Sequence, residues 1–352
     1  MPSTIQPKTH LVNREPETLT APQKQTQNME DLKVVFMGTP EFAVPILEEL
    51  IKSDFKPRAI ITAPDKPVGR NLNLTPPPVK VLVQENNIPI FQPETKDELI
   101  SQTSELKPDL IIVAAYGKIL SREILNLPKY GSINVHPSIL PKHRGPSPIQ
   151  FAILNGDPKT GVTIMLMNEK MDEGPILSQE IVKITKDETA KTLEEKLSLK
   201  GAKLLIKTLK QWIALEEMPE TAKKLIYPQE QDNSQATYTK IITKQDGKIL
   251  WDKNAKELEQ QIRAFYPWPG SFTFLKQNGH KVQNIKILKA DILELNTEKD
   301  LGAFFLTENK KLAVQTGKDC LIIEELQPEN GKPMSASNFL NGHPEIIGTT
   351  LE

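Results

Sequence analysis

The sequence predicts an α/β domain with a mainly parallel sheet, followed by a small β-barrel. Apolar runs typical of buried strands alternate with helix-spaced patterns between residues 32 and 212. Residues 214–237 are polar and contain two prolines, as is typical of a linker. Five short strand patterns with Gly and Asn turns follow residue 270. Alternating strands and helices form a sheet that is covered on both faces and binds ligands at the carboxyl ends of its strands.

The composition indicates a soluble globular protein without a strong global charge. The 352 residues are 38% hydrophobic and 25% charged, and the formal net charge is −1. The single cysteine, Cys320, excludes a disulfide framework within the chain and a multi-cysteine zinc site. No run approaches the roughly 18 apolar residues of a membrane span. We therefore expect a cytoplasmic protein that binds no metal.

The chain begins with a stretch that does not resemble a folded element. Residues 1–30 are rich in Gln, Thr and Pro and lack the apolar segment of a secretion signal. This composition predicts a disordered extension. Met29 directly precedes the first regular pattern, so it is an alternative start of translation.

The first domain, predicted at residues 31–213, begins with a strand at 32–37, the turn GTPEF and a helix to residue 53. Further strands are predicted at residues 58–62, 88–91, 109–115, 132–136, 161–168 and 176–184. Further helices are predicted at residues 79–85, 96–107, 121–126 and 189–212. The GTPEF turn fits neither GxGxxG nor GxxxxGK[ST], which argues against a dinucleotide-binding or phosphate-binding loop.

The second domain is predicted at residues 238–352, after the linker at 214–237. A helix is expected at residues 255–264, before the aromatic and Pro-rich stretch YPWPG. The strands are predicted at residues 271–275, 281–290, 302–307, 310–316 and 319–326. Five short strands in about a hundred residues are typical of a small antiparallel barrel, for example of the oligonucleotide-binding (OB) type.

Candidate reactive side chains lie where the 132–136 strand ends. Alternation places Asn134 and His136 on one face of the strand, before the stiff loop SILPKHRGPSP. Asn can donate to a developing oxyanion, and His exchanges protons near neutral pH. Asp172, in the turn after the 161–168 strand, could orient the imidazole. Taken alone, an Asn and a His at this position also fit an exposed polar strand edge.

No nucleophilic side chain accompanies these three residues. Cys320 lies in the other domain, and no Ser occupies a GxSxG elbow. The pattern therefore favours direct transfer, in which the amine of a substrate attacks an acyl donor. The enzyme would stabilise the tetrahedral intermediate and move protons.

Several blocks resemble the folate-dependent formyltransferases. INVHPSILPKHRGPSPIQFAILNGD and MDEGPIL resemble the two signature blocks of this family. VVFMGTPEFAVPIL, PDKPVGR, VAAYGKIL, RAFYPWPGSF and LQPENGKPMSASNFLNG are similar to the branch that acts on methionyl-tRNA. The resemblance runs from about residue 31 to residue 342, with its blocks in the family's order.

This resemblance implies a Rossmann-like formyltransferase domain and an OB-like, tRNA-binding C-terminal domain. The implied reaction transfers the formyl group of 10-formyltetrahydrofolate to methionyl initiator tRNA for translation initiation. The implied catalytic residues are Asn134, His136 and Asp172. The implied tetrahydrofolate-binding residues are Ser138, Ile139, Leu140 and Pro141.

The loop at residues 65–74 corresponds to the family's tRNA-contacting insertion, with Arg70 at its key arginine. This chain has NLNL after Arg70, where many relatives carry lysines. It also has Lys142 and His143 where many members have Arg and Tyr. The first departure places more of the expected electrostatic contact on Arg70.

Local charge supports an RNA partner. Residues 240–289 contain ten Lys or Arg against four Asp or Glu, whereas residues 290–352 contain five against eleven. A basic stripe entering the barrel, with Lys240 and Lys244 as candidates, could follow tRNA phosphates. An ordinary solvated face is the alternative explanation.

Two other functions remain open, although a monomer that acts on initiator tRNA is expected. A related formyltransferase could act on a small amine, such as glycinamide ribonucleotide or an amino sugar nucleotide. Those relatives share the Asn, His and Asp blocks and are expected to lack the C-terminal barrel. A non-catalytic module that binds folate or RNA is the second alternative.

Overall fold

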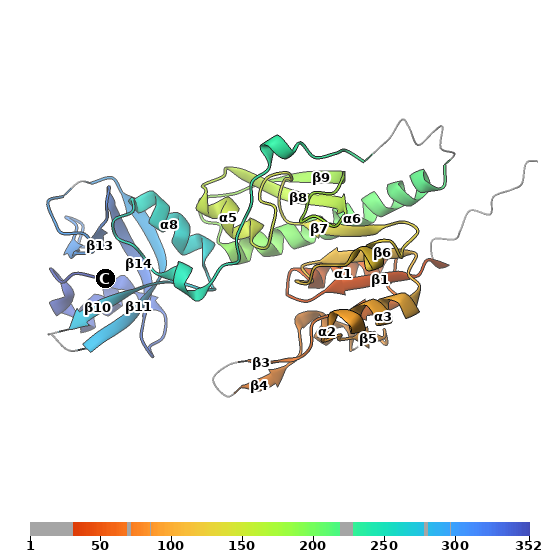
Figure 1. Cartoon of the computed structure of the whole chain (residues 1–352). Helices are drawn as coiled ribbons and strands as arrows, with labels where there is room; N and C mark the ends of the chain where they lie inside the picture. The colour runs from red at the N-terminus through yellow and green to blue at the C-terminus, as the bar shows by residue number, and fades with distance from the viewer. Residues whose placement is uncertain (1–30, 69–71, 85, 219–227, 278–280, 296) are drawn as a thin grey trace, which may run out of the picture.

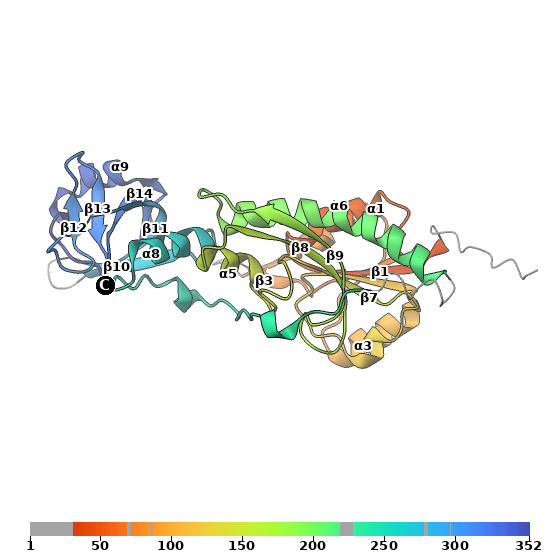
Figure 2. The ribbon, with the colours of Figure 1, turned by 90° about the horizontal axis from the view of Figure 1, so that it is seen from above.

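The computed structural model describes residues 31–68, 72–84, 86–218, 228–277, 281–295 and 297–352 (Figure 1). The predicted N-terminal extension, including Met29, lies outside the described residues. The described chain forms an α/β part and a β-rich part at opposite ends of an elongated molecule, as Figures 1 and 2 both show.

The α/β part is built on a seven-stranded sheet in the order β5-β2-β1-β6-β7-β8-β9. Its strands are β1 (Val34–Gly38), β2 (Ala59–Ile61), β5 (Ile90–Phe91), β6 (Leu110–Ala114), β7 (Ser132–His136), β8 (Lys159–Leu166) and β9 (Ile176–Lys183). The pairs from β5 to β7 are parallel, and β8 is antiparallel to both β7 and β9. The prediction of a mainly parallel sheet is confirmed.

Helices cover both faces of this sheet because its central strands are apolar on both sides. The helices are α1 (Ala43–Ile51), α2 (Pro78–Val83), α3 (Lys96–Leu106), α4 (Arg122–Leu125) and α6 (Ala190–Glu216). On β1, Val34 and Phe36 pack in the same core cluster as residues of α1 and α6. Val35 and Met37 pack on the other face, with residues of α3 and α4. The alternation of β1 therefore supplies both hydrophobic cores.

Some elements differ from the sequence prediction. Helix α6 continues past the predicted end at Trp212 to Glu216, because Ile213 is buried and extends the apolar stripe. Helix α5 (Pro148–Leu154) was not predicted, and neither was the hairpin of β3 (Lys66–Val68) and β4 (Asn73–Thr75). The hairpin strands are only three residues long and β4 is exposed, so they leave no hydrophobic pattern.

The β-rich part is an antiparallel sheet in the order β10-β11-β14-β13-β12. Its strands are β10 (Ser271–Gln277), β11 (Lys281–Leu293), β12 (Phe304–Leu306), β13 (Leu312–Gln315) and β14 (Cys320–Pro328), with β15 (Met334–Ser335) paired to β14. Helix α8 (Ala255–Ala264) and the short α9 (Ala336–Gly342) pack on it. The predicted small barrel domain is confirmed, although α9 and β15 were not predicted.

The two parts meet through a packed boundary. Helix α8 lies against α5, and Ile242, Ala264 and Phe265 belong to the hydrophobic core of the α/β part. Arg263 Nη1 also donates a hydrogen bond to the Glu188 main-chain oxygen at 3.0 Å. Residues near the start of the second part therefore stabilise the first.

Helix α6 packs closely against the back of β7. A Cβ atom added at Gly201 of α6 would lie 3.0 Å from Val135 Cγ1 and 3.2 Å from Val162 Cγ1. Val135 is on the face of β7 opposite to Asn134 and His136, by strand alternation. The missing side chain at Gly201 thus allows direct helix-to-strand contact behind these two residues.

We expect the substitution Gly201→Leu to lower the free energy of unfolding by about 1–3 kcal/mol, because the larger side chain overpacks this contact. Chemical denaturation followed by circular dichroism measures the change. Lys203→Leu places the same side chain at an exposed position of α6 and is the matched control. Equal stability of the two variants would show that α6 can move away from β7 without cost.

Candidate active site

The structure brings Asn134, His136 and Asp172 together at the carboxyl end of β7. Asp172 lies in the turn between β8 and β9. Its Oδ1 accepts a long hydrogen bond from Asn134 Nδ2 at 3.4 Å and lies 3.7 Å from His136 Nδ1. The His136 side chain is 5% exposed and that of Asp172 is 16% exposed. Three polar side chains therefore converge at a largely buried point of the sheet edge.

A main-chain contact determines which nitrogen of His136 is available. His136 Nε2 lies 3.0 Å from the main-chain oxygen of His143. A carbonyl oxygen only accepts, so Nε2 carries the proton and donates it to this bond. In the neutral ring, Nδ1 then holds the free electron pair, on the side of Asp172. The imidazole is thus oriented with Nδ1 toward Asp172 and Nε2 toward the loop.

The Asp172 carboxylate is held by the loop that follows β7. Gly145 N donates a hydrogen bond to Asp172 Oδ2 at 2.7 Å, which leaves Oδ1 directed at Asn134 and His136. Asp172 has φ = 51°, a left-handed conformation that residues other than Gly rarely adopt. Its contacts must therefore offset the cost of this backbone conformation.

The second nearby imidazole is used elsewhere. His143 is buried, and its Nε2 lies 2.6 Å from Asp157 Oδ2. Asp157 precedes β8 by two residues. Its main chain supports His136, whereas its side chain forms this separate pair. His136 is accordingly the imidazole of the candidate site.

The predicted folate-binding residues form a tightly bonded loop directly after His136. Thr163 Oγ1 donates to the Ser138 main-chain oxygen at 2.7 Å and accepts from Leu140 N at 3.2 Å. Ser138 Oγ donates to the Lys142 main-chain oxygen at 2.6 Å. Ile139 packs over Gly161, where an added Cβ would lie only 2.3 Å from Ile139 Cδ1. These contacts give the loop a fixed shape beside the three polar side chains.

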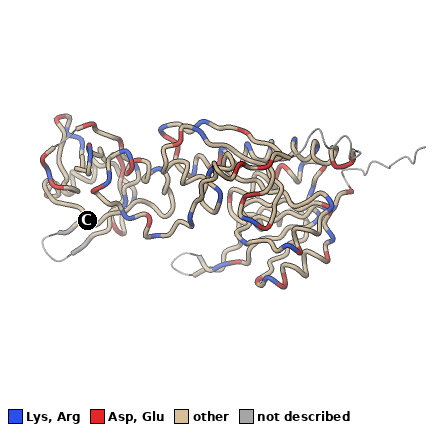
Figure 3. The backbone as a smooth tube through the Cα atoms, turned by 45° about the horizontal axis from the view of Figure 1, so that its top comes forward, with Lys and Arg blue, Asp and Glu red and all other residues tan. Residues whose placement is uncertain are grey.

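The predicted tRNA contacts lie in different surroundings. Arg70 is outside the described residues. Lys240 forms an ion pair with Asp246, whereas Lys244 is exposed at the start of the 3-10 helix Lys244–Gly247. Figure 3 shows basic and acidic residues interspersed along this part of the chain. Ion pairs such as Lys289 with Glu324 therefore neutralise part of the basic stretch that the sequence indicated.

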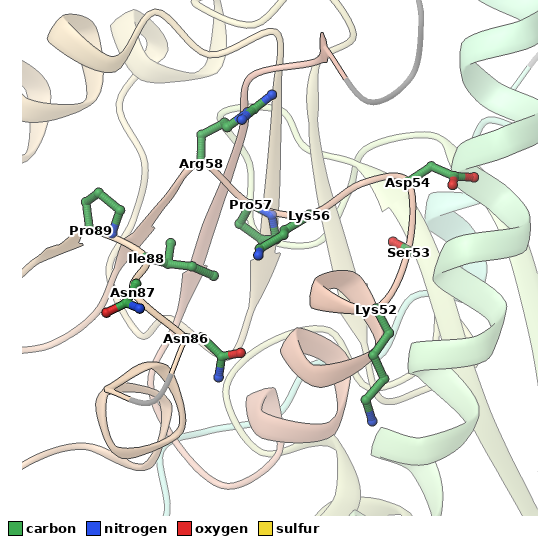
Figure 4. A pocket seen from close by; sticks show the side chains of 10 residues that line it. All are labelled: Lys52, Ser53, Asp54, Lys56, Pro57, Arg58, Asn86, Asn87, Ile88 and Pro89. Carbon is green, nitrogen blue, oxygen red and sulfur yellow. The ribbon is translucent and has the colours of Figure 1, made fainter.

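Two cavities lie at opposite edges of the α/β sheet. A cavity of about 720 Å³, lined mainly by apolar and proline side chains, is at the carboxyl ends of β1 and β2, beside the β3–β4 hairpin. A polar cavity of about 610 Å³ is at the amino ends of β2 and β5 (Figure 4). There Asp54 forms an ion pair with Lys210 of α6. The candidate site and the apolar cavity share the carboxyl edge, where α/β sheets bind ligands.

Two other features are absent from the described residues. In this part of the chain no group of three or more His, Cys, Asp or Glu is arranged to hold a metal ion. Nor does any described helix have the length and apolar character needed to cross a membrane.

Sequence reasoning missed the groups that support the three side chains. The His143 carbonyl and the Gly145 N–H belong to the main chain, so no residue type signals their roles. Thr163 lies in the 161–168 pattern, which predicted only a strand. One signal was available in the sequence, namely the arginine next to Gly145. Arg144 is fully buried, and a buried arginine needs hydrogen-bond acceptors around it.

The family model described as formyl transferase matches residues 32–209, and the model for the formyl transferase C-terminal domain matches residues 241–344. The methionyl-tRNA formyltransferase of Geobacillus sp. (strain WCH70) is 43% identical over 314 residues, which are 88% of this chain and 94% of that protein. The methionyl-tRNA formyltransferase of Bacillus velezensis is 42% identical over 322 residues, 91% of this chain and 97% of that protein.

Solved structures share the fold at lower identity. The N-formyltransferase of Helicobacter canadensis, solved with folinic acid and dTDP-3-aminofucose, is 23% identical, with a TM-score of 0.58 over 83% of this chain and 99% of that chain. HypX of Aquifex aeolicus, solved with tetrahydrofolic acid, is 13% identical, with a TM-score of 0.55 over 90% of this chain and 48% of that chain.

The Lys240–Asp246 pair predicts a pH-dependent contribution to stability. Lys240, and then Thr243, lower the pKa of Asp246 to about 2. Because the ordinary pKa is about 4, the ionised group stabilises the folded state above that value and loses this effect as the pH falls toward 2. Asp246→Asn should lower the free energy of unfolding near neutral pH, and the difference from the wild type should shrink in acid.

Urea denaturation followed by tryptophan fluorescence, at several pH values from about 7 to about 3, measures this difference. Asp300→Asn, at an exposed position in the same domain, is the control and should show no such trend. A difference between the wild type and Asp246→Asn that stays constant into acid would contradict the assignment.

Proposed function

The chain belongs to the formyl transferase family, and from this we propose that it transfers the formyl group of 10-formyltetrahydrofolate to the amino group of methionyl initiator tRNA. The reaction prepares the tRNA for translation initiation. It is an acyl transfer between two bound substrates and uses no nucleophilic side chain of the enzyme.

One observation carries this proposal: the match to methionyl-tRNA formyltransferases runs through both domains at more than 40% identity. The site geometry supports it. A proton-exchanging imidazole, an amide donor and a carboxylate converge at the carboxyl edge of the sheet, beside the loop Ser138–Pro141. These are the groups that direct attack of an amine on a formyl carbon requires.

His136 would manage the protons of the reaction. As the amine attacks the formyl carbon, its nitrogen becomes positively charged and must lose a proton, while N10 of the folate must gain one on leaving. Nδ1 of His136 can take the first proton and return one to the leaving nitrogen, because Nε2 stays bonded to the His143 carbonyl. The Asp172 carboxylate, 3.7 Å away, stabilises the imidazolium between these two steps.

Asn134 would act on the oxygen of the same intermediate. Its amide donates to Asp172 Oδ1 over 3.4 Å, a weak bond that can be exchanged for one to a negatively charged oxygen. Hydrogen bonds of catalytic groups are often long in the absence of substrate and tighten in the transition state. Asn134 can therefore stabilise the oxyanion at little cost.

Substrate binding is divided between the domains in this proposal. Residues 31–213 form the catalytic domain, in which Ser138, Ile139, Leu140 and Pro141 bind the folate. Residues 238–352, reached through the linker at 214–237, bind tRNA together with Arg70. Lys240 and Lys244 lie where the chain enters this second domain. We propose that the enzyme acts as a monomer in the cytoplasm.

A formyltransferase for a small amine is the nearest alternative. The overlay on the Helicobacter canadensis N-formyltransferase extends over 83% of this chain, well beyond the catalytic domain. A C-terminal domain therefore does not by itself separate the two classes, contrary to the expectation from sequence. The higher identity to methionyl-tRNA formyltransferases over both domains favours the tRNA substrate.

We expect His136→Ala to lower kcat by about 100-fold to 10,000-fold, with similar KM values for both substrates, because general acid–base catalysis is lost. The assay follows the formylation of radiolabelled Met-tRNA by 10-formyltetrahydrofolate. His343→Ala, in the C-terminal domain, is the control. Normal turnover by His136→Ala would contradict the mechanism. An amino sugar nucleotide and glycinamide ribonucleotide are assayed in parallel. If the wild type prefers either of them, the assignment of Met-tRNA as the substrate is wrong.

Lys244→Glu should raise the KM for Met-tRNA by about threefold to tenfold, because it replaces an attraction to phosphate by a repulsion. The value of kcat and the KM for 10-formyltetrahydrofolate should stay unchanged, since Lys244 does not lie among the three reactive side chains. Steady-state kinetics with varied Met-tRNA measures this effect. Lys311→Glu makes the same charge change at an exposed position before β13. Equal KM values for the two variants would remove Lys244 from the tRNA interface.

A further inference from the structure

A fully buried arginine lies in the loop after β7. The Arg144 side chain has no exposed surface. Its Nε and Nη2 donate to Gln231 Oε1 at 3.1 and 2.7 Å, and Nη2 also donates to Asn233 Oδ1 at 2.8 Å. Glu173 Oε2 lies 3.8 Å from Nη1. Because a buried guanidinium is costly without matched acceptors, Gln231 and Asn233 must stay in place.

Gln231 connects this arginine to the turn that carries Asp172. Its Nε2 donates to the main-chain oxygens of Asp172 at 2.8 Å and Gly174 at 2.7 Å. The guanidinium only donates, so the amide oxygen must face Arg144 and the amide NH₂ must face the turn. The oxygen of this buried amide is therefore hydrogen-bonded to Arg144, and its NH₂ group is hydrogen-bonded to the turn.

The turn needs such support because of its backbone. Asp172 adopts the left-handed conformation, with φ = 51°, which Gly adopts routinely and Asp only occasionally. Gln231 holds its main-chain oxygen, while Gly145 N holds its carboxylate. The direction of Oδ1 toward His136 depends on both contacts.

Residues 229–239 are fastened to the catalytic domain on either side of Gln231. Gln229 exchanges two main-chain hydrogen bonds with Ile176 at the start of β9, at 2.7 and 2.8 Å. Farther along, Arg144 N donates to the Thr237 oxygen at 2.9 Å, and Thr239 N donates to the Arg144 oxygen at 2.8 Å. This segment, which the sequence indicates as linker up to residue 237, runs back along the catalytic domain before it reaches α8 (Figure 2).

We propose that Gln231 is a positioning residue that directs the Asp172 carboxylate toward His136. Through this one side chain, the segment that joins the two domains contributes to the position of the Asp172 turn. This inference rests on the proposed function, because it assigns Gln231 to the Asp172 and His136 of that reaction.

The substitution Gln231→Glu separates the two contacts of this side chain. Glu has nearly the same shape and keeps an acceptor for Arg144, so the buried guanidinium stays paired. It replaces the NH₂ group by an oxygen that faces two carbonyl oxygens, so both bonds to the turn are lost. Gln229→Glu is the matched control, because it makes the same change two residues earlier on the same segment, at an exposed position.

We expect Gln231→Glu to lower kcat for Met-tRNA formylation by about 10-fold to 100-fold, the scale of a misplaced catalytic group, with both KM values within about twofold. Gln229→Glu should behave as the wild type. A folded Gln231→Glu enzyme with normal kcat would overturn the proposal. So would a defect found only in the KM for Met-tRNA, which would assign the segment to tRNA binding instead.

A second variant and a substrate-free measurement complete the test. Gln231→Met has a similar length and no hydrogen-bonding end, and should lose kcat to the same extent, so normal kcat in this variant also overturns the proposal. In ¹⁵N-histidine-labelled free protein, the His136 imidazole signals, assigned with His136→Ala, should shift in Gln231→Glu and stay unchanged in Gln229→Glu. Unchanged signals in Gln231→Glu would overturn the proposal. Because this readout needs no substrate, its result is independent of whether Met-tRNA is the acceptor.

Discussion

Burial of the Arg144 guanidinium is the constraint on which the structure of the candidate site depends. An unpaired charge at this depth would cost on the order of several kcal/mol, so its acceptors determine where the surrounding segments lie. Those acceptors come mainly from residues 231–238, which must therefore pack against the loop after β7. The same loop supplies the carbonyl that fixes His136 and the N–H that holds Asp172. The loop, the turn before β9 and the interdomain segment thus form one cooperative unit.

Strand β7 is also supported on the face opposite to the candidate site. Gly201 allows α6 to contact Val135 directly, on the face of β7 opposite to the reactive side chains. Strand β7 also has β6 on one side and β8 on the other, so its backbone hydrogen bonds are made within the sheet. In the proposed reaction, this support would keep the β7 backbone in place while His136 and Asn134 act.

Much of the fold could be predicted, because its main elements have strong hydrophobic patterns. Strand β7 and helix α8 have the predicted bounds, whereas the seven-residue α5 and the β3–β4 hairpin, whose β4 strand is exposed, have patterns too short to detect. Within the site, strand alternation places Asn134 and His136 on one face. The approach of Asp172 depends on how β8 and β9 pair, which no local pattern encodes. The contacts of the His143 carbonyl and of Gln231, which is 59 residues from Asp172, depend on tertiary structure alone.

The ion pair between Lys240 and Asp246 bears on how RNA binding would respond to ionic strength. A lysine that meets a phosphate normally releases a condensed cation from the nucleic acid, and each such contact steepens the fall of affinity with added salt. If Lys240 leaves Asp246 for a phosphate, the freed carboxylate attracts a cation from solution and cancels part of that release. The carboxylate acts as a counterion that belongs to the protein. The slope of affinity against salt concentration would therefore indicate fewer phosphate contacts than the domain would make.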